Sequence, residues 1–286
     1  MKKKSIKRKL VTFLRYLTVI FIGIIMIYPL IWMLGASFKT NNKIFNSVVP
    51  FTLSPVLDGY KKAFDDYGGQ INLLFAIINT YCFVVPKVLF TLFSCTITAY
   101  GFSRFIFKGK KILFGLLIAT LFIPQTVMKV PQFIMYNKFG WIDSPLYLPL
   151  IVPSLFAYDS YFVFMLVQFF RGIPSELDEA ASIDGCSTFQ ILFHIIMPLL
   201  KPALVSCALF QFIWSSNDFV GPLLYVNTPS RYPASMFVKL SMDADVGFEW
   251  NRVLAVSLIS IIPSVVIFFC AQKNFTDNIT AGGIKE

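Results

Sequence analysis

Residues 179–198 read EAASIDGCSTFQILFHIIMP, and this stretch defines the class of protein more closely than any other. It is polar at its start and has the residue types of a helix. It lies between apolar segments that are each long enough to cross a bilayer. A membrane protein with such an insert has a segment outside the bilayer to which a soluble partner can bind.

The composition places the rest of the chain in a membrane. Of the 286 residues, 56% are hydrophobic and only 14% are charged, whereas soluble proteins average roughly 25% charged residues. The net charge of +10 does not indicate nucleic-acid binding, because lysines and arginines sit at the ends of apolar runs rather than in a stripe with aromatic residues. The basic excess is instead a signal of membrane topology.

Six apolar segments are predicted to be membrane-spanning helices. They cover approximately residues 14–37, 73–99, 112–136, 146–170, 202–225 and 253–272. The first is longer than the apolar core of a signal peptide and lacks a small-residue cleavage site, so we expect it to be retained. Prolines inside several segments predict kinked helices around a pathway, since neighbouring helices can satisfy the carbonyls that proline frees. The prediction is an all-α integral membrane protein forming a single membrane domain, residues 1–286.

The basic residues also predict the orientation. With a cytoplasmic N-terminus, the inner segments hold 15 lysines and arginines and the outer loops hold nine. This bias favours a multi-pass protein with both termini in the cytoplasm. It places residues 179–198 on the cytoplasmic side as well.

The insert is predicted to form a helix, a turn and a second helix. Pro174 suits a first helical turn, and acidic residues follow it near the positive end of the helix dipole. Asp184 and Gly185 suit a turn, because glycine adopts a positive φ without steric cost. Residues 186–197 then have the pattern of an amphipathic helix, which we expect Pro198 to end. An ordinary interfacial helix between two spans is the structural alternative.

The spacing of this insert resembles the coupling loop of ABC-importer permeases, E-A-A-x3-G-x9-I-x-L-P, with Met197 in place of leucine. The resemblance continues along the chain. Residues 100–109 (YGFSRFIFKG) resemble the family's basic inner loop, and residues 124–144 resemble its third span and outer loop. Trp214 and residues 217–223 (NDFVGPL) resemble its W-N-D/E-F-x-x-P-L element, with Ser215 and Ser216 inserted. Residues 281–285 (AGGIK) resemble the closing A-G-A-V-K.

By this resemblance the chain is similar to bacterial inner-membrane permeases for carbohydrates, of the maltose type. The family implies six transmembrane helices with a cytoplasmic helix–turn–helix coupling loop (the type I ABC importer permease fold), a core region over residues 73–272 and a coupling loop over residues 174–200. It also implies the partners: a second homologous permease, an ATPase dimer, an extracellular solute-binding protein and membrane lipid, with no nucleic acid. The ATP and Mg²⁺ would be used by the ATPase, and this chain would bind no cofactor.

The resemblance assigns ATPase coupling to six residues of the insert. They are Glu179, Ala180, Ala181, Asp184, Gly185 and Pro198. The carboxylates of Glu179 and Asp184 would form ion pairs with the ATPase, the two alanines would keep the helix slim, and Gly185 would form the turn.

Polar and aromatic residues of the spans are candidates for the solute pathway, since polar groups within a membrane are costly. The candidates are Asn79, Tyr81, Gln125, Trp214, Asn217 and Asp218. Asn79 and Asn217 would hydrogen-bond sugar hydroxyls, and Tyr81 or Trp214 would stack on a sugar face. The alternative is hydrogen bonding between helices, worth about 0.6 kcal/mol each on average.

The sequence lacks the residues that nucleotide binding, triad catalysis and metal binding require. The chain has no G-x-x-x-x-G-K-[ST] sequence, so it cannot cradle ATP. The single histidine, His194, rules out most catalytic triads, and neither it nor the five cysteines suggests a metal site. We therefore expect a non-catalytic subunit. The sequence leaves two alternative functions open: an ion-gradient-driven transporter that uses Lys87, Asp159 and Asp218, and a membrane scaffold without a pathway.

Overall fold

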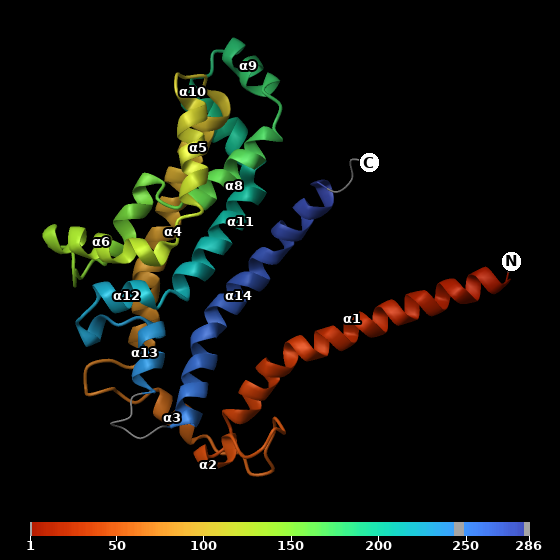
Figure 1. Ribbon diagram of the computed structural model, residues 1–286, viewed down its shortest axis with the longest axis vertical. Coiled ribbons are helices and arrows are strands. Elements are labelled where there is room, and N and C mark those ends of the chain that lie inside the picture. The colour runs from red at the N-terminus through yellow and green to blue at the C-terminus, as the bar shows by residue number, and fades with distance from the viewer. Residues whose placement is uncertain (1, 243–248, 283–286) are drawn as a thin grey trace. The chain divides into compact units, whose positions relative to one another are not determined.

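The computed structural model describes residues 2–242 and 249–282, and the described residues form helices and loops without a strand (Figure 1). The elements in chain order are α1 Lys2–Ala36, α2 Asn41–Ile44, α3 Asp58–Ala63, α4 Leu73–Arg104, α5 Lys110–Thr120, α6 Gln125–Lys138, α7 Leu148–Ile151, the 3₁₀ helix η1 Val152–Phe156, α8 Ser160–Arg171, α9 Glu176–Ile183, α10 Thr188–Gln190, the π-helix η2 Ile191–Ile196, α11 Met197–Ser216, α12 Val220–Tyr225, the 3₁₀ helix η3 Pro229–Arg231, α13 Ala234–Leu240 and α14 Trp250–Gly282. Residues 283–285 of the C-terminal stretch compared above lie outside the described residues.

The predicted all-helical membrane architecture is confirmed. Within the described residues, five helical stretches are long and apolar enough to cross a bilayer: Lys9–Ala36, Leu73–Arg104, Leu148–Arg171, Thr188–Ser216 and Trp250–Gln272. A sixth span results if α5 and α6 are counted together.

The third predicted span is not one continuous helix. α5 and α6 meet at an angle of 100° across the break at residues 121–124. Pro124 lies directly before α6 with φ −60° and ψ 120°, an extended conformation outside the helical region. In contrast, α4 and α14 continue through Pro86 and Pro263. A complete break at a proline is therefore found before α6, and the helix is continuous at Pro86 and Pro263.

The fifth span begins and ends earlier than predicted. The prediction placed it at residues 202–225, but α11 begins at Met197, passes through Pro202 and ends at Ser216. α12 is a separate short helix. The expectation that Pro198 would end the second helix of the insert is wrong, because α10, η2 and α11 follow one another without a break.

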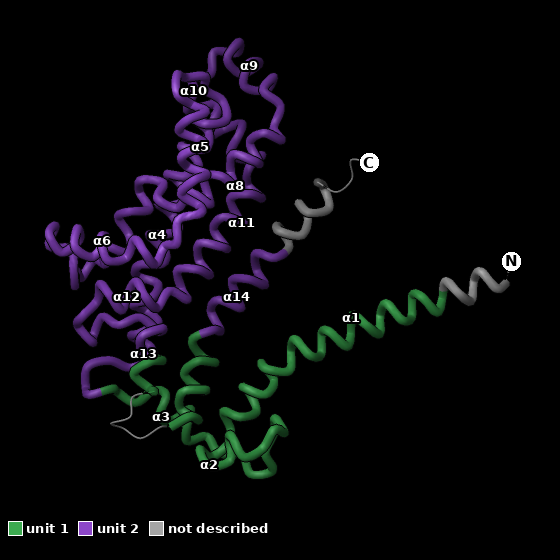
Figure 2. The backbone as a smooth tube through the Cα atoms, in the orientation of Figure 1, with its two compact units in different colours: residues 1–67, 238–260 green, residues 68–237, 261–286 purple. Residues whose placement is uncertain are grey.

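The chain forms two compact units (Figure 2). Unit 1 contains residues 1–67 and 238–260, and unit 2 contains residues 68–237 and 261–286. In unit 2, α4 packs against α8, α11 and η1. One apolar core lies around the C-terminal half of α4, with α8, α9, η2 and α11, and includes Cys95, Phe162 and Ile196. A second apolar core lies around Phe83 and Val84 and contains Tyr147, Phe212 and Tyr225. The predicted limits of the core region, residues 73–272, stay a prediction.

In unit 1, the segment after α1 folds back on the end of that helix. The Tyr28 hydroxyl donates a hydrogen bond to the Val48 carbonyl at 2.9 Å. Gly35 permits this approach, because a Cβ there would lie 2.3 Å from the Pro50 carbonyl oxygen. The fold-back closes where the Val56 N–H donates to the Phe38 carbonyl at 2.9 Å.

Candidate functional site

The insert forms a short helix, α9, with α10 close by at one end of unit 2 (Figure 1). Glu176, Asp178 and Glu179 occupy its first turn, where negative charge favours the exposed N–H groups of a helix. The predicted first helix of the insert is thus present, with the bounds Glu176–Ile183. The expectation that Pro174 lies in its first turn is wrong, because the helix begins two residues later.

α9 ends in a Schellman motif centred on Gly185. The Cys186 N–H donates to the Ala181 carbonyl at 3.0 Å, and the Gly185 N–H donates to the Ser182 carbonyl at 3.1 Å. Gly185 has φ +84°, and a Cβ there would meet no atom within 4 Å. The position therefore favours glycine for its backbone conformation and not for lack of space.

The second helix begins with a capping box. The Ser187 hydroxyl accepts from the Gln190 N–H at 3.4 Å, and the Gln190 side-chain carbonyl accepts from the Ser187 N–H at 2.7 Å. The helix then widens into the π turn η2 and continues as α11, where Pro198 lies in the first turn. Proline is tolerated inside this continuous helix because the widened π turn directly before it is a local adjustment that accommodates the ring and the missing N–H. The second helix of the insert and the fifth span are consequently one continuous helix.

Arg104 at the end of α4 holds α9 in place. Its Nε lies 2.7 Å from Asp178 Oδ2, and its guanidinium donates to the Ile173 carbonyl at 3.0 Å. Burial raises the pKa of Asp178, and the Arg104 charge offsets only part of that rise. Ala181, on the same side of α9, is 5% exposed and belongs to the core of unit 2. α9 is therefore attached both to α4 and to the core.

The opposite side of α9 faces outward. Glu176, Glu179, Ala180 and Ile183 occupy positions i, i+3, i+4 and i+7, which lie on one face of a helix, and all four are exposed. Ile183 is 87% exposed. We call these four residues the outward face of α9. Asp184 and Gly185 beside it are exposed too, so of the six predicted coupling residues only Ala181 is directed into the core. An exposed surface that combines carboxylates with a large apolar side chain is suited to docking.

The polar candidates of α4 and α6 have separate surroundings. The Asn79 amide donates to the carbonyls of Ser230 at 2.9 Å and Tyr232 at 3.2 Å, which ties α4 to the segment around η3. The Tyr81 ring stacks on Phe212 at 5.8 Å. Gln125 is exposed at the start of α6.

The candidates at the end of α11 shape the turn into α12. The Asn217 amide donates to the Ile213 carbonyl of its own helix at 2.8 Å. Asp218 Oδ1 accepts from the Gly221 N–H at 3.0 Å. Trp214 is half exposed and packs against Tyr161 at 5.1 Å. Among the described residues, no hydrogen bond or ring contact joins any two of the six pathway candidates, so they do not form one cluster.

A second polar centre joins spans that sequence reasoning did not connect. Asp159 lies in the non-helical break between η1 and α8, where Ala157 has φ +51°. Its carboxylate accepts from the Gln211 amide at 3.2 Å. In the sequence, Asp159 is one of the residues that an ion-gradient-driven transporter would use, and no sequence pattern identifies Gln211 as its partner.

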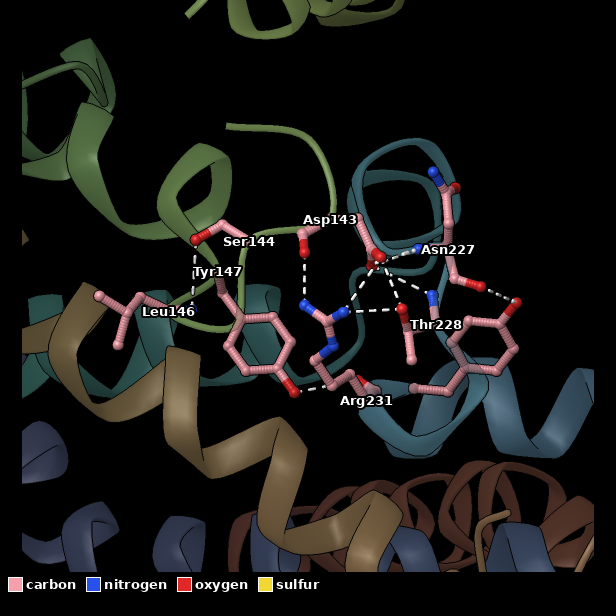
Figure 3. A network of polar contacts seen from close by, with 8 residues as sticks. Asp143, Ser144, Leu146, Tyr147, Asn227, Thr228 and Arg231 are labelled. Carbon is pink, nitrogen blue, oxygen red and sulfur yellow. Dashed lines mark hydrogen bonds and ion pairs between the residues drawn. The ribbon is translucent and has the colours of Figure 1, made fainter. Parts of the chain in front are cut away.

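A network around Asp143 connects the loop after α6 with the segment after α12 (Figure 3). Asp143 Oδ1 accepts from the N–H groups of Asn227 at 2.9 Å and Thr228 at 3.0 Å. Oδ2 accepts from the Thr228 hydroxyl at 2.5 Å and pairs with Arg231 at 3.0 Å. Arg231 also donates to the Asp143 carbonyl, and its own carbonyl accepts from Tyr147 at 2.9 Å.

The charge on Asp143 is stabilised by this network. Burial acts to raise the pKa of Asp143, but the hydrogen bonds from Thr228 and Asn227 and the Arg231 charge outweigh it and hold the pKa below its ordinary value. Asp143 and Arg231 are 88 positions apart in the chain, and no sequence pattern relates them. Sequence reasoning missed both, although Asp143 falls within the loop that resembles the family's outer loop.

Comparison with known proteins gives a consistent result. Residues 5–279 match the family model described as "Binding-protein-dependent transport system inner membrane component". The chain is 33% identical to the galactooligosaccharides transport system permease protein GanQ of Bacillus subtilis, with 98% of each chain covered. It is 32% identical to the probable starch degradation products transport system permease protein AmyC of Thermoanaerobacterium thermosulfurigenes, with 100% of each covered. A chain of a bacterial ABC transporter that imports the acidic polysaccharide alginate superposes with a TM-score of 0.79 at 19% identity, over 93% of this chain and 97% of that one.

Proposed function

The chain belongs to the family of binding-protein-dependent transport system inner membrane components, and from that membership we propose that it forms half of the pathway of an importer for oligosaccharides. The family consists of permease subunits that do not themselves hydrolyse ATP. Membership removes the ion-driven transporter and the scaffold that the sequence alone left open. The sugar class rests on the relatives that are named for galactooligosaccharides and starch products.

The partners proposed for the chain follow from the same membership. A solute-binding protein delivers the sugar, a second permease completes the pathway, and a separate ATPase dimer supplies the energy from ATP and Mg²⁺. Both termini and residues 174–200 lie in the cytoplasm. The excess of basic residues in the segments on that side supports this orientation.

The observation that carries the proposal is the construction of α9. Its outward face is free within the described chain and combines two carboxylates with Ile183, and its inner side is fixed to the core. We propose that this face docks in a cleft of the ATPase, with Glu179 and Asp184 pairing with basic residues there. Pro198 contributes indirectly, because it lies where η2 passes into α11 within the continuous helix that begins in the insert.

The attachments of α9 provide a route for coupling. Arg104 joins α9 to the end of α4, and η2 and α11 continue the second helix of the insert into a span. A displacement of α9 by the ATPase would therefore move the ends of α4 and α11 together. Packed helices shift as rigid bodies rather than deforming continuously.

The pathway residues remain proposals with differing support. Trp214 has an exposed ring that suits stacking on a sugar, and Gln125 has an exposed amide. Tyr81 has its ring engaged with Phe212. Asn79, Asn217 and Asp218 already have intramolecular partners, which favours a role in positioning the helices of the pathway.

The test is co-purification of the tagged chain with a co-expressed second permease and ATPase, followed by uptake assays in proteoliposomes. With the binding protein added, wild type should import labelled galactooligosaccharide or maltodextrin in an ATP-dependent way. Asp184→Arg should recover about tenfold less ATPase, since loss of roughly 1.4 kcal/mol from docking is tenfold in affinity, and should still insert into the membrane.

Asp66→Arg is the matched control, because Asp66 is also an exposed carboxylate in a loop but lies in unit 1. It should leave ATPase recovery and uptake at the wild-type level. Full recovery and uptake with Asp184→Arg would defeat the coupling proposal. ATP-dependent uptake of a non-sugar solute alone would defeat the sugar class while leaving coupling intact.

A further inference from the structure

The segment that follows α1 forms an open pocket within unit 1, lined by six polar residues and by Phe51 and Leu53. The pocket has a volume of about 340 Å³, within the range of small-ligand sites. Its polar lining consists of Lys39, Lys43, Asn46, Ser47, Thr52 and Ser54. All these side chains can donate hydrogen bonds, and none is a carboxylate.

Lys39 is the most deeply placed of these residues. Its side chain is fully buried, and the residue as a whole is only 2% exposed. The ammonium donates to the carbonyls of Val49 at 2.5 Å and Ser47 at 3.3 Å. These carbonyls are neutral, and among the described residues no carboxylate forms an ion pair with Lys39. Buried charges in proteins are normally paired with an opposite charge, so the Lys39 ammonium makes this pocket attractive to an anion.

Lys43 adds a second positive charge at the mouth of the pocket. It is exposed, and its Nζ lies 3.4 Å from the Ser54 hydroxyl. Residues 37–57 contain neither aspartate nor glutamate. The pocket is therefore positive and is not neutralised by any acidic residue of its own segment.

The surroundings of the pocket are those of a membrane–water boundary. The segment directly follows the Lys9–Ala36 span. Tyr28 binds its backbone, and Trp250 packs edge-on against Phe45 at 5.3 Å. Tyrosine and tryptophan favour the boundary between hydrocarbon and headgroups. Phe51 and Leu53 line the pocket, and they belong to a set of exposed large apolar side chains on the same segment: Phe45, Val48, Val49, Phe51, Leu53 and Leu57. Such a set on one short segment indicates contact with lipid.

We propose that this pocket binds the phosphate of an anionic phospholipid. The two lysines provide the charge, the hydroxyls of Ser47, Thr52 and Ser54 provide further donors, and the apolar side chains lie against the acyl chains. The site anchors the segment after α1 to the membrane surface at the end of that helix. The inference does not depend on the transported solute or on the coupling proposal.

The test uses the purified full-length chain in detergent and counts bound phosphatidylglycerol by native mass spectrometry. Wild type should retain phosphatidylglycerol in preference to phosphatidylcholine. Lys43→Gln should bind it about fivefold more weakly, the effect expected for one lysine at a membrane surface. Lys61→Gln is the matched control, because Lys61 is exposed in the neighbouring α3 but does not line the pocket, and it should bind like wild type.

Three further measurements separate the sources of the anion. Inorganic phosphate at millimolar concentration should displace little lipid, whereas full displacement would show that the pocket takes free phosphate. A polyglutamate peptide that binds in preference to the lipid would point to an acidic protein partner and overturn the lipid assignment. Lys39→Met should abolish the selectivity for phosphatidylglycerol. Equal retention by wild type and Lys43→Gln, or equal loss in Lys43→Gln and Lys61→Gln, would overturn the proposal.

Discussion

Gly185 is a residue at which backbone conformation alone decides the amino acid. Its φ of +84° lies in the left-handed region, and open space surrounds it. Gly109, in the loop before α5, has φ +85° and is equally open. The two positions therefore impose the same strain on any substituent, of about 1–2 kcal/mol, but only Gly185 ends the helix proposed to dock.

We predict that Gly185→Val lowers the recovery of the ATPase by about tenfold, because roughly 1.4 kcal/mol of strain is a factor of ten in affinity. Gly109→Val should lower it by less than twofold. Quantitative co-purification at equal membrane expression measures both. Equal effects of the two variants would mean that strain in either loop acts through folding, and that the end of α9 has no special role.

Asp143 and Arg231 form the most highly connected charged pair of the described chain (Figure 3). Arg231→Gln removes the ion pair and hydrogen bonds to a charged group, each worth about 1.5–3 kcal/mol. We predict a lower midpoint of thermal unfolding in detergent at neutral pH. Lys108→Gln, at an exposed lysine, should leave the midpoint unchanged.

The pH dependence of this loss has a definite sign. The network lowers the pKa of Asp143, so its contribution to stability is complete above the ordinary carboxyl pKa of about 3.9 and disappears as the pH falls through the lower folded value. The difference in midpoint between wild type and Arg231→Gln should therefore narrow between pH 6 and pH 3. A difference that stays constant over that range would show that the Asp143 charge does not contribute.

At the scale of elements, α9 depends on its attachment to α4. Arg104→Gln leaves Asp178 without its cation, although this carboxylate is largely shielded from solvent. We predict that amide hydrogens of residues 176–185 exchange about tenfold faster, since losing a partly buried charged contact costs about 1–3 kcal/mol. Hydrogen–deuterium exchange of the purified chain measures this directly.

The double variant Arg104→Gln/Asp178→Asn separates the ion pair from general damage. The neutral amide removes the unpaired charge, so protection of residues 176–185 should return in part. If the double variant exchanges as fast as Arg104→Gln, the arginine acts through its bond to the Ile173 carbonyl and not through its charge on Asp178.

At the scale of the molecule, the distribution of basic residues predicts which loops lie on which side of the membrane. Asp66 is in the long loop between the first two spans, and Lys108 is in the loop between α4 and α5. Both are exposed. In a background without the five native cysteines, Asp66→Cys should react with an impermeant maleimide in intact cells. Lys108→Cys should react only after the membrane is opened.

The reverse pattern would invert the proposed orientation and place residues 174–200 outside the cell. That result would also end the proposal that α9 contacts a cytoplasmic ATPase. Labelling of both positions in intact cells would instead indicate leaky membranes, and the signal of a cytosolic marker protein controls for this.

The sequence by itself determined the membrane class, the approximate position of the spans and the helix–turn–helix form of residues 174–200. These features depend on local properties: the length of apolar runs, the charges at their ends, and the preference of acidic residues and Gly185 for particular places in a helix. Each is encoded within about 20 neighbouring residues. Local sequence did not predict the effect of individual prolines. The helix is broken between α5 and α6, directly before Pro124, whereas it continues through Pro198.

Only the tertiary structure decided which distant residues meet. Arg104 with Asp178, Asp143 with Arg231, Asp159 with Gln211, and Ala181 with the core are contacts between elements that lie far apart in the chain. The burial of Lys39 is also decided by the folded segment, although its partners lie only eight and ten residues further along the chain, because they are backbone carbonyls that no side-chain pattern reveals. Such contacts follow from how whole helices and loops pack, and packing depends on the shapes of all the neighbours at once, whereas a span or a helix end depends only on its own segment.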